Sequence, residues 1–312
     1  MTDGDIVSVR PTTGEVRVLY RRKSRFNSLL VTESCNNRCV MCSQPPEDGE
    51  VDALFNEVLD AIPLMDTATP ELVITGGEPT LLKDALFELV RSCESYLPRT
   101  SLLLLTNGRL FAYLAYAQEL ANLKHHNLTV AIPLYSDIAH EHEYIVQAKG
   151  SFDQTIWGLM NLGRCLQRIE LRIVIHKLNL QRLPSIANFT ARNLPFVAHV
   201  ALMGMEPVGF AKANLKELWV DPVDYGPQLT AAVQLLQQNH ICTSIYNHQL
   251  CTLDRSLWNV SRQSISDWKN LFVEECNSCS VRRQCGGFFA TSAQKHSRGT
   301  RDIAIESSAT SA

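Results

Sequence analysis

Short apolar segments alternate with amphipathic segments between residues 28 and 210, and this alternation constrains the fold more than any other feature. The apolar segments cover 28–33, 71–75, 101–106, 128–134, 169–176 and 196–203. Between them, apolar residues recur every three or four positions, as in Leu82, Leu86 and Leu89, which is the helical period. Apolar strands that are each followed by a helix predict parallel β/α units, with helices covering the sheet.

The number of these units limits the architecture. A closed eight-unit barrel usually takes about 250 residues, and about 180 residues are present here. We therefore predict an α/β fold, a partial (β/α)6 barrel over residues 28–210, and the pattern alone leaves a doubly wound sheet as the alternative. In both folds the chemistry is expected at the carboxyl ends of the strands. Residues 1–27 are predicted to form a hairpin over 5–20 and a lead-in to the barrel.

The pattern changes after residue 210. A helix over 222–239 and a short strand near 241–246 precede a cysteine-rich, weakly periodic segment from 247 to 289. We interpret 211–290 as a small C-terminal extension that a metal holds together, since so short a segment cannot build a core of its own. Residues 291–312 are polar and rich in small side chains, so we expect a disordered tail.

The overall composition excludes several classes of function. A net charge of −3 provides no basic surface for nucleic acid or an anionic membrane. Apolar runs of signal-peptide or membrane-spanning length are lacking, so we expect a cytoplasmic protein. In that compartment ten cysteines are not expected to form a disulfide framework, because thiols are kept reduced there.

Three cysteines follow the first predicted strand, namely Cys35, Cys39 and Cys42 in the spacing C-x3-C-x2-C. Three thiolates on one short loop can bind three irons of a [4Fe–4S] cluster and leave the fourth iron open. An electron-transfer cluster normally has four cysteine ligands, so a triad indicates that a substrate or cofactor takes the open position. The alternatives are a zinc site completed by a distant ligand, or chance proximity of the thiols.

Turn motifs follow the next two predicted strands. Thr75-Gly76-Gly77-Glu78-Pro79 ends the second strand, and Thr106-Asn107-Gly108 ends the third. Glycines let a backbone approach a ligand closely, and the Glu78 carboxylate is suited to receive an ammonium group. An ordinary strand-to-helix turn is the alternative at each place. Because the three features occupy successive strand ends, we expect them to share one cleft.

The cysteine triad, the Gly-Gly-Glu-Pro turn and the Thr-Asn-Gly turn together resemble the radical S-adenosylmethionine (SAM) superfamily over about residues 28–210. The resemblance implies that Cys35, Cys39 and Cys42 bind a catalytic [4Fe–4S] cluster and that SAM occupies its open iron. It implies reductive cleavage of SAM to methionine and a 5′-deoxyadenosyl radical that abstracts hydrogen from a substrate carbon. Further SAM contacts implied by the resemblance are Gly76, Gly77, Glu78, Pro79, Asn107, Ser136 and Arg172. Ser136 has a turn residue as its alternative role, and Arg172 an ion pair with Glu170.

A second cysteine group lies in the C-terminal extension. Cys276, Cys279 and Cys285 have the spacing C-x2-C-x5-C, and Cys251 lies upstream, with Cys242 as an alternative fourth ligand. Four thiolates suit either a structural zinc or an iron–sulfur cluster. The spacing resembles the auxiliary-cluster extensions of peptide-modifying radical SAM proteins, which implies one auxiliary [4Fe–4S] cluster.

Several strings, among them TESCNNRCVMCSQPP, ITGGEPTLL, MGMEPVG and SISDWKN, resemble the His-Xaa-Ser system radical SAM maturase family HxsC. This resemblance implies a precursor peptide as substrate, a second radical SAM maturase (HxsB-like) as partner and an external one-electron donor. We therefore predict a radical SAM peptide maturase. The alternatives are a non-catalytic iron–sulfur partner of another maturase and a small-molecule radical SAM enzyme.

Overall fold

A computed structural model describes residues 1–47, 51–263, 270–292 and 295–304. Its centre is one parallel sheet of seven strands. The strands are β3 (Asn27–Leu30), β4 (Glu71–Thr75), β5 (Ser101–Leu105), β6 (Leu128–Pro133), β7 (Arg168–Ile175), β8 (His199–Gly204) and β9 (Cys242–Tyr246).

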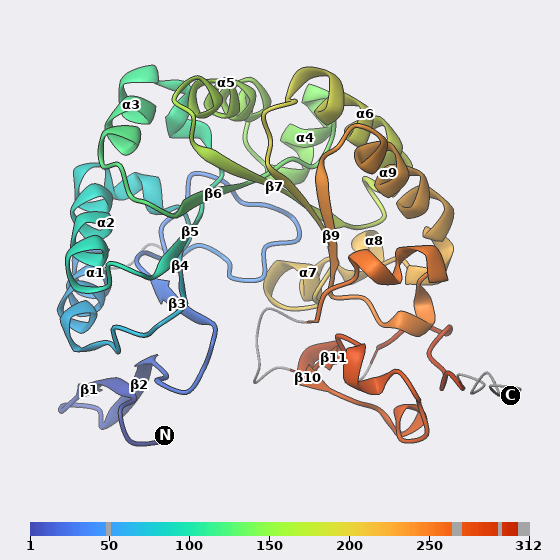
Figure 1. Cartoon of the computed structure of the whole chain (residues 1–312), viewed down its shortest axis with the longest axis horizontal. Coiled ribbons are helices and arrows are strands. Elements are labelled where there is room, and N and C mark those ends of the chain that lie inside the picture. The colour runs from blue at the N-terminus through green and yellow to red at the C-terminus, as the bar shows by residue number, and fades with distance from the viewer. Residues whose placement is uncertain (48–50, 264–269, 293–294, 305–312) are drawn as a thin grey trace, which may run out of the picture.

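The order of the strands settles the choice between a barrel and a doubly wound sheet. Every strand pairs with the next strand in the sequence, from β3 to β9, and the order never reverses. A doubly wound sheet reverses direction at its switch point, whereas a barrel winds one way. Figure 1 shows the sheet curving into an open arc with helices along its outer side. The predicted α/β partial-barrel fold is confirmed.

The sheet contains one strand more than the six predicted. β9 lies parallel to β8, with His199 opposite Cys242 and Met203 opposite Tyr246. Helix α9 (Gly226–Gln238) precedes β9 and packs against α6 (Leu183–Asn193). The segment 222–246 is therefore a seventh β/α unit of the barrel, although the sequence suggested that the barrel ends near 210. The segment 205–225 forms only short helical elements and no strand, so it interrupts the alternation of strand and helix that the sequence shows up to residue 203.

The remaining helices also follow strands. Each main crossover helix buries one apolar face against the sheet, as Leu86, Leu89 and Val90 of α2 do. The short helices α4, α7 and α8 were not predicted, because each is too short to show a helical period. The bounds are α1 (Val51–Ala61), α2 (Asp84–Tyr96), α3 (Leu114–Asn122), α4 (Ala139–Val146), α5 (Ser151–Arg164), α7 (Gly209–Ala213) and α8 (Leu215–Leu218). No helix among the described residues is long and apolar enough to cross a bilayer.

The two faces of the strands differ in polarity. Leu72 and Ile74 of β4 are fully buried against the helices, whereas Glu71, Val73 and Thr75 alternate with them and face the barrel interior, here called the lumen. The same alternation on β7 directs Glu170 and Arg172 into the lumen. The hydrophobic core thus lies between sheet and helices, while the lumen carries charged groups.

The predicted N-terminal hairpin is present. β1 (Ile6–Arg10) pairs antiparallel with β2 (Glu15–Tyr20) outside the main sheet. The Tyr20 hydroxyl lies 2.8 Å from Thr69 Oγ1, and Arg17 forms an ion pair with Glu57 of α1. These contacts attach the hairpin to the first β/α unit.

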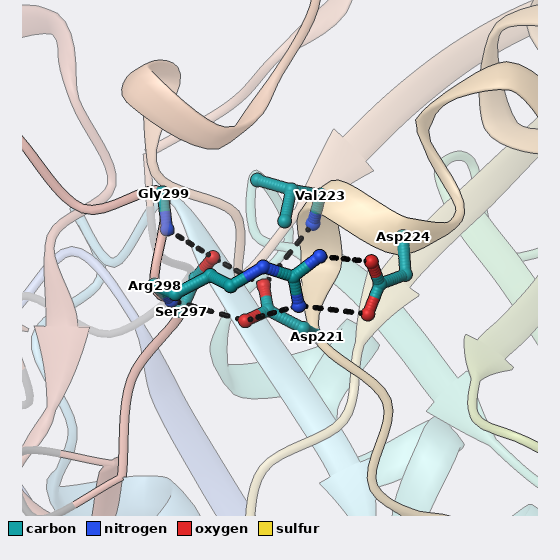
Figure 2. Close-up of polar contacts among 6 residues, drawn as sticks. All are labelled: Asp221, Val223, Asp224, Ser297, Arg298 and Gly299. Carbon is teal, nitrogen blue, oxygen red and sulfur yellow. Dashed lines mark hydrogen bonds and ion pairs between the residues drawn. The ribbon is translucent and has the colours of Figure 1, made fainter.

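The C-terminal segment differs from the prediction of a disordered tail from residue 291. Ser297 is buried, its hydroxyl donates to Asp221, and the Arg298 backbone N–H donates to the other Asp221 oxygen at 3.0 Å. The Arg298 guanidinium also pairs with Asp224 (Figure 2). A buried carboxylate requires hydrogen-bond donors, and residues 297–298 supply them. Residues 297 and 298 are therefore bound to the barrel, and the Ile303 carbonyl accepts from Ser280 N–H of the extension. Residues 293–294 and 305–312 lie outside the described residues.

Candidate active site

The loop that follows β3 carries Cys35, Cys39 and Cys42, and backbone hydrogen bonds hold it from several sides. The N–H groups of Arg38 and Val40 donate to the carbonyls of Val146 and Ile145 at the end of α4. Near its end, the Cys42 carbonyl accepts from Phe210 N–H at 2.8 Å, at the start of α7. The loop is thus fixed by the barrel and does not depend on the thiols for its course.

The three thiols lie near enough to affect one another's charge, and each cysteine is partly buried. Burial is the largest of the causes that raise the pKa of Cys35 to about 11 and that of Cys39 to about 12. The negative charges of Glu78 and Cys42 contribute to the rise at Cys35, and those of Cys42 and Cys35 contribute to the rise at Cys39. Burial also raises the pKa of Cys42. Without a bound cation these groups remain thiols, since a thiolate in this environment is poorly solvated. Metal binding would displace their protons.

Three neighbouring thiols on one loop suit a [4Fe–4S] cube. Among the described residues, no three Cys, His, Asp or Glu side chains are placed as ligands of one metal ion. In a [4Fe–4S] cube each thiolate binds a different iron, so three neighbouring thiols need not converge on one point. The Asn37 N–H donates to Cys35 Sγ at 3.4 Å. Hydrogen bonds to the sulfurs of an iron–sulfur cluster affect its reduction potential.

The Gly-Gly-Glu-Pro turn packs directly against the cysteine loop. A Cβ on Gly76 would lie 2.5 Å from the Thr32 carbonyl oxygen, and one on Gly77 would overlap the carbonyls of Glu33 and Ser34. The Gly77 N–H donates to Thr32 O, and the Glu78 N–H to Ser34 O, both at 2.8 Å. The glycines therefore permit close contact between two backbone segments. Their predicted contact with SAM stays a prediction.

The Glu78 side chain is fully buried and points into the protein. Its Oε1 accepts from Thr80 N–H, Thr80 Oγ1 and Thr106 Oγ1, and its Oε2 accepts from Asn107 N–H at 2.6 Å. Burial raises the pKa of Glu78, and these four hydrogen bonds oppose that rise. The carboxylate thus joins the turns after β4 and β5. The predicted contact of Glu78 with the SAM ammonium group stays a prediction.

Asn107 and Arg109 continue this connection into the cysteine loop. Asn107 Nδ2 donates to Asn36 Oδ1 at 2.6 Å, and Arg109 donates to Asn36 O at 2.7 Å and to Asn37 Oδ1 at 2.6 Å. We call Glu78, Asn107 and Arg109 the loop clamp. Neither Arg109 nor Asn36 was predicted from the sequence to have a role. Their positions in the sequence could have indicated one. Asn36 lies between two of the cysteines, and Arg109 directly follows the turn at the end of β5.

Ser136 and Arg172 occupy the alternative roles considered for them. The Ser136 hydroxyl is buried, donates to Glu141 at 2.6 Å and accepts from Ile138 N–H, as in a helix-start turn. Arg172 Nε forms an ion pair with Glu170 at 2.6 Å. Pro79 begins a short 3-10 turn, Pro79–Leu82. The SAM contacts predicted for these residues remain predictions.

A cavity of about 350 Å³ lies in the lumen beside the cysteine loop. Met41 and Ser43 line it from that loop, Thr75 and Gly204 from strand ends, and Phe289 from the C-terminal extension. This volume is in the range of ligand-binding pockets. A substrate group in the cavity would therefore contact the part of the cysteine loop that carries Met41 and Ser43.

The four C-terminal cysteines also meet at one place. Cys251, Cys276, Cys279 and Cys285 line one small cavity, although they come from separate turns. Burial raises the pKa of Cys251, and the charges of Cys285 and Cys276 raise it further. Cys242, the alternative ligand, is exposed at the amino end of β9 and does not line this cavity. Here too, no three described side chains are placed as ligands of a single ion.

The model of the Radical SAM superfamily matches residues 29–190, which include the cysteine loop, the Gly-Gly-Glu-Pro turn and the clamp. The chain belongs to the radical SAM superfamily. It is a radical SAM enzyme, and the family implies a [4Fe–4S] cluster and SAM.

Its curated relatives include probable GTP 3′,8-cyclases. One from Saccharolobus islandicus (strain M.14.25 / Kamchatka #1) is 29% identical over 192 residues, 61% of this chain and 59% of that protein. A GTP 3′,8-cyclase of Peptoclostridium acidaminophilum is 27% identical over 147 residues, 45% of this chain and 43% of that one. The chain thus spans less than two thirds of the length of the curated relatives it matches.

Solved structures share the fold at low identity. Streptococcus suis SuiB bound to S-adenosylmethionine has a TM-score of 0.55 and 14% identity, covering 73% of this chain and 51% of that one. A radical SAM methyltransferase from Sphaerobacter thermophilus has a TM-score of 0.53 and 15% identity, with coverages of 77% and 72%. At these identities the likeness shows the fold alone.

Proposed function

We propose that this radical SAM enzyme is a peptide maturase that modifies a ribosomally made peptide, of the His-Xaa-Ser repeat type. The observation that carries the proposal is the meeting of Cys251, Cys276, Cys279 and Cys285 at one cavity, as an auxiliary-cluster extension requires. Two structures with a similar fold are described with peptides, SuiB with precursor peptide SuiA and anSMEcpe with a Cp18Cys peptide. These neighbours support the substrate class.

The roles of the residues follow from their positions. Cys35, Cys39 and Cys42 are proposed to hold the catalytic [4Fe–4S] cluster, and SAM to lie beside the 76–79 turn. When bound, cluster and SAM together supply a carbon-centred radical that abstracts hydrogen. The loop clamp keeps the cysteine loop fixed over the lumen, and the apolar wall formed by Val73, Leu103 and Leu105 excludes water from the substrate.

The C-terminal cysteines are proposed to bind one auxiliary [4Fe–4S] cluster, with structural zinc as the alternative. Each thiolate of a cube binds its own iron, which suits four thiols that surround a cavity from separate turns. We further propose an HxsB-like partner, an external one-electron donor and a cytoplasmic location, where ten free cysteines stay reduced.

A small-molecule substrate is the second candidate. The curated relatives are named GTP 3′,8-cyclases, which favours a nucleotide over a peptide. The cavity of about 350 Å³ is compatible with a compact ligand. A non-catalytic iron–sulfur scaffold is disfavoured, because a loop clamp around a three-thiol site serves no purpose in a protein without an open iron.

The test compares the two substrates in one assay. Anaerobically reconstituted protein is given SAM and dithionite with either a His-Xaa-Ser repeat precursor peptide or GTP, and 5′-deoxyadenosine and substrate masses are followed. We expect the peptide to raise 5′-deoxyadenosine formation and to change mass, and Cys39→Ala to abolish both effects. Consumption of GTP with no change in the peptide would contradict the proposal and establish the second candidate.

A further inference from the structure

Glu71 stands where two cavities of the lumen meet. The cavity beside the cysteine loop and a larger one of about 800 Å³ at the amino ends of the strands share Phe26, Glu71, Leu103 and Arg172 as lining residues. Glu71 is the first residue of β4 and lies on its lumen face. Its carboxylate is therefore accessible from both cavities.

The neighbouring charged groups are already paired with one another. Glu170 Oε1 accepts from Arg172 Nε at 2.6 Å, and Glu170 Oε2 lies 2.8 Å from His199 Nδ1. His199 Nε2 lies 3.0 Å from Ser244 Oγ. Glu71, in contrast, has no hydrogen bond or ion pair with any described residue. A partly buried carboxylate without a protein partner can accept a charge-assisted hydrogen bond from a ligand.

The local electrostatics favour a cation as that ligand. Burial raises the pKa of Glu71, and the charge of Glu170 raises it further, against a smaller opposing effect of Arg172. At the Glu71 carboxylate itself, the negative charge of Glu170 thus outweighs the positive charge of Arg172, which Glu170 already pairs. Arg25, Arg168 and Arg262 line only the larger cavity, where they are exposed and salt screens them.

The distances suit a substrate that spans the lumen. Thr75 lies four residues after Glu71 on β4, which separates the two by about 13 Å at about 3.3 Å per residue. Thr75 lines the same cavity as Glu71, and so do Met41 and Ser43 of the cysteine loop. If one group of a substrate binds Glu71, the rest of that substrate can therefore reach the cysteine loop.

We propose that Glu71 binds a positively charged side chain of the substrate and so sets how deeply the substrate enters the lumen. This inference rests on the proposed function, because it names a feature of the substrate. It predicts a basic residue a short distance from the modified position. Arg172, which is paired with Glu170, lines the site in this proposal and does not bind the substrate charge.

The test uses two probes that differ in charge and little in shape, N-acetyl-arginine amide and N-acetyl-citrulline amide. Binding to the reconstituted protein with SAM is measured by calorimetry. We expect the arginine probe to bind at least about tenfold more tightly, as a charge-assisted hydrogen bond in a sheltered site does. Glu71→Gln should abolish this difference, and Glu71→Asp should retain part of it.

Two controls locate the effect. Glu88→Gln changes an exposed carboxylate of α2 and should leave the preference intact. Glu206→Gln changes another carboxylate of the same cavity, and a preference lost there but kept in Glu71→Gln would overturn the proposal. So would a wild-type protein that does not bind the arginine probe better than the citrulline probe. Failure of the proposed function would appear separately, as absence of peptide modification by the wild type.

Discussion

The two cysteine sites differ in how the protein holds them. The loop with Cys35, Cys39 and Cys42 is bonded to the turns after β4 and β5, to α4 and to α7. The site of Cys251, Cys276, Cys279 and Cys285 lies among short 3-10 turns and two two-residue strands, β10 (Asn270–Leu271) and β11 (Phe288–Phe289). Few described contacts join it to the rest, among them Gln249 Nε2 to Gly287 O at 2.7 Å and Ser280 N–H to Ile303 O.

This difference shows what determines the geometry of each site. At the first site the barrel and the loop clamp specify the positions of the thiols before any metal binds. At the second site little secondary structure surrounds the thiols, so a bound metal must supply much of the order. The first arrangement suits a reaction centre that must be oriented, and the second suits a closed centre that ties an extension to the barrel.

The largest effect is expected at the loop clamp. Glu78→Gln places an amide NH₂ among four donors, so at least one buried donor loses its acceptor and faces another donor. We expect a loss of about 3 kcal/mol in the free energy of unfolding, measured in urea. SAM cleavage should fall with it, because the cysteine loop loses its anchor. Glu88→Gln should change stability by less than about 0.5 kcal/mol, and an equal effect of both variants would refute the clamp.

Removal of one C-terminal ligand should affect the extension alone. Cys279→Ser opens the second site, and we expect amide hydrogen exchange of residues 270–292 to accelerate by about 100-fold. Exchange in β4 and β5 should stay as it is in the wild type. Acceleration throughout the barrel would show that the two sites are not held independently.

A buried histidine near the boundary of barrel and extension predicts acid sensitivity. His248 Nδ1 donates to Tyr246 O at 2.8 Å and Nε2 accepts from the Tyr225 hydroxyl at 2.7 Å, so the ring is neutral. Burial lowers the pKa of His248 to about 4, from an ordinary 6.5, against the smaller opposing effect of the Tyr246 carbonyl. Between pH 6.5 and pH 4 the unfolded chain therefore binds the extra proton, and stability falls as pH falls.

Because of this histidine, the free energy of unfolding should fall by about 2 kcal/mol when the pH is lowered from 6.5 to 5. The slope for one proton is about 1.4 kcal/mol per pH unit. Urea unfolding at several pH values gives the slope, and His248→Gln should flatten it by up to one proton. His240→Gln, at the exposed end of α9, is the matched control. A slope that His248→Gln leaves unchanged would count against the neutral buried ring.

The smallest effect is expected where the C-terminal segment meets the barrel. Ser297→Ala removes one hydroxyl donor from buried Asp221, while the Arg298 N–H still donates to that carboxylate. We expect a loss of about 1 kcal/mol and faster exchange near residues 297–299. Ser95→Ala, at an exposed position of α2, should change stability by less than about 0.5 kcal/mol. If Ser297→Ala is as silent, the docking seen in Figure 2 contributes nothing to stability.

The sequence predicted the barrel well, because parallel strands buried against helices leave continuous apolar runs. It missed β9 as a barrel strand, since that strand follows a segment that interrupts the alternation and resembles part of the extension. The packing of residues 297 and 298 was also missed, because a single buried carboxylate, Asp221, determines it and leaves no periodic signal.

At the site, the sequence located the cysteines and the strand-end turns but not the direction in which side chains point. Glu78 faces the interior and Ser136 faces α4, which only the folded backbone decides. Arg109 and Glu71 were overlooked because each acts through contacts with residues far away in the sequence.

The most direct test of two independently held cysteine sites is anaerobic iron analysis with EPR on three proteins: wild type, Cys35/Cys39/Cys42→Ala and Cys276/Cys279/Cys285→Ala. We predict about eight irons in the wild type and about four in each variant, from one [4Fe–4S] cluster at each site. Only the wild type and the second variant should show an EPR signal that changes when SAM is added. A first variant that keeps the SAM-dependent signal, or a wild type without iron at Cys35, Cys39 and Cys42, would contradict the account.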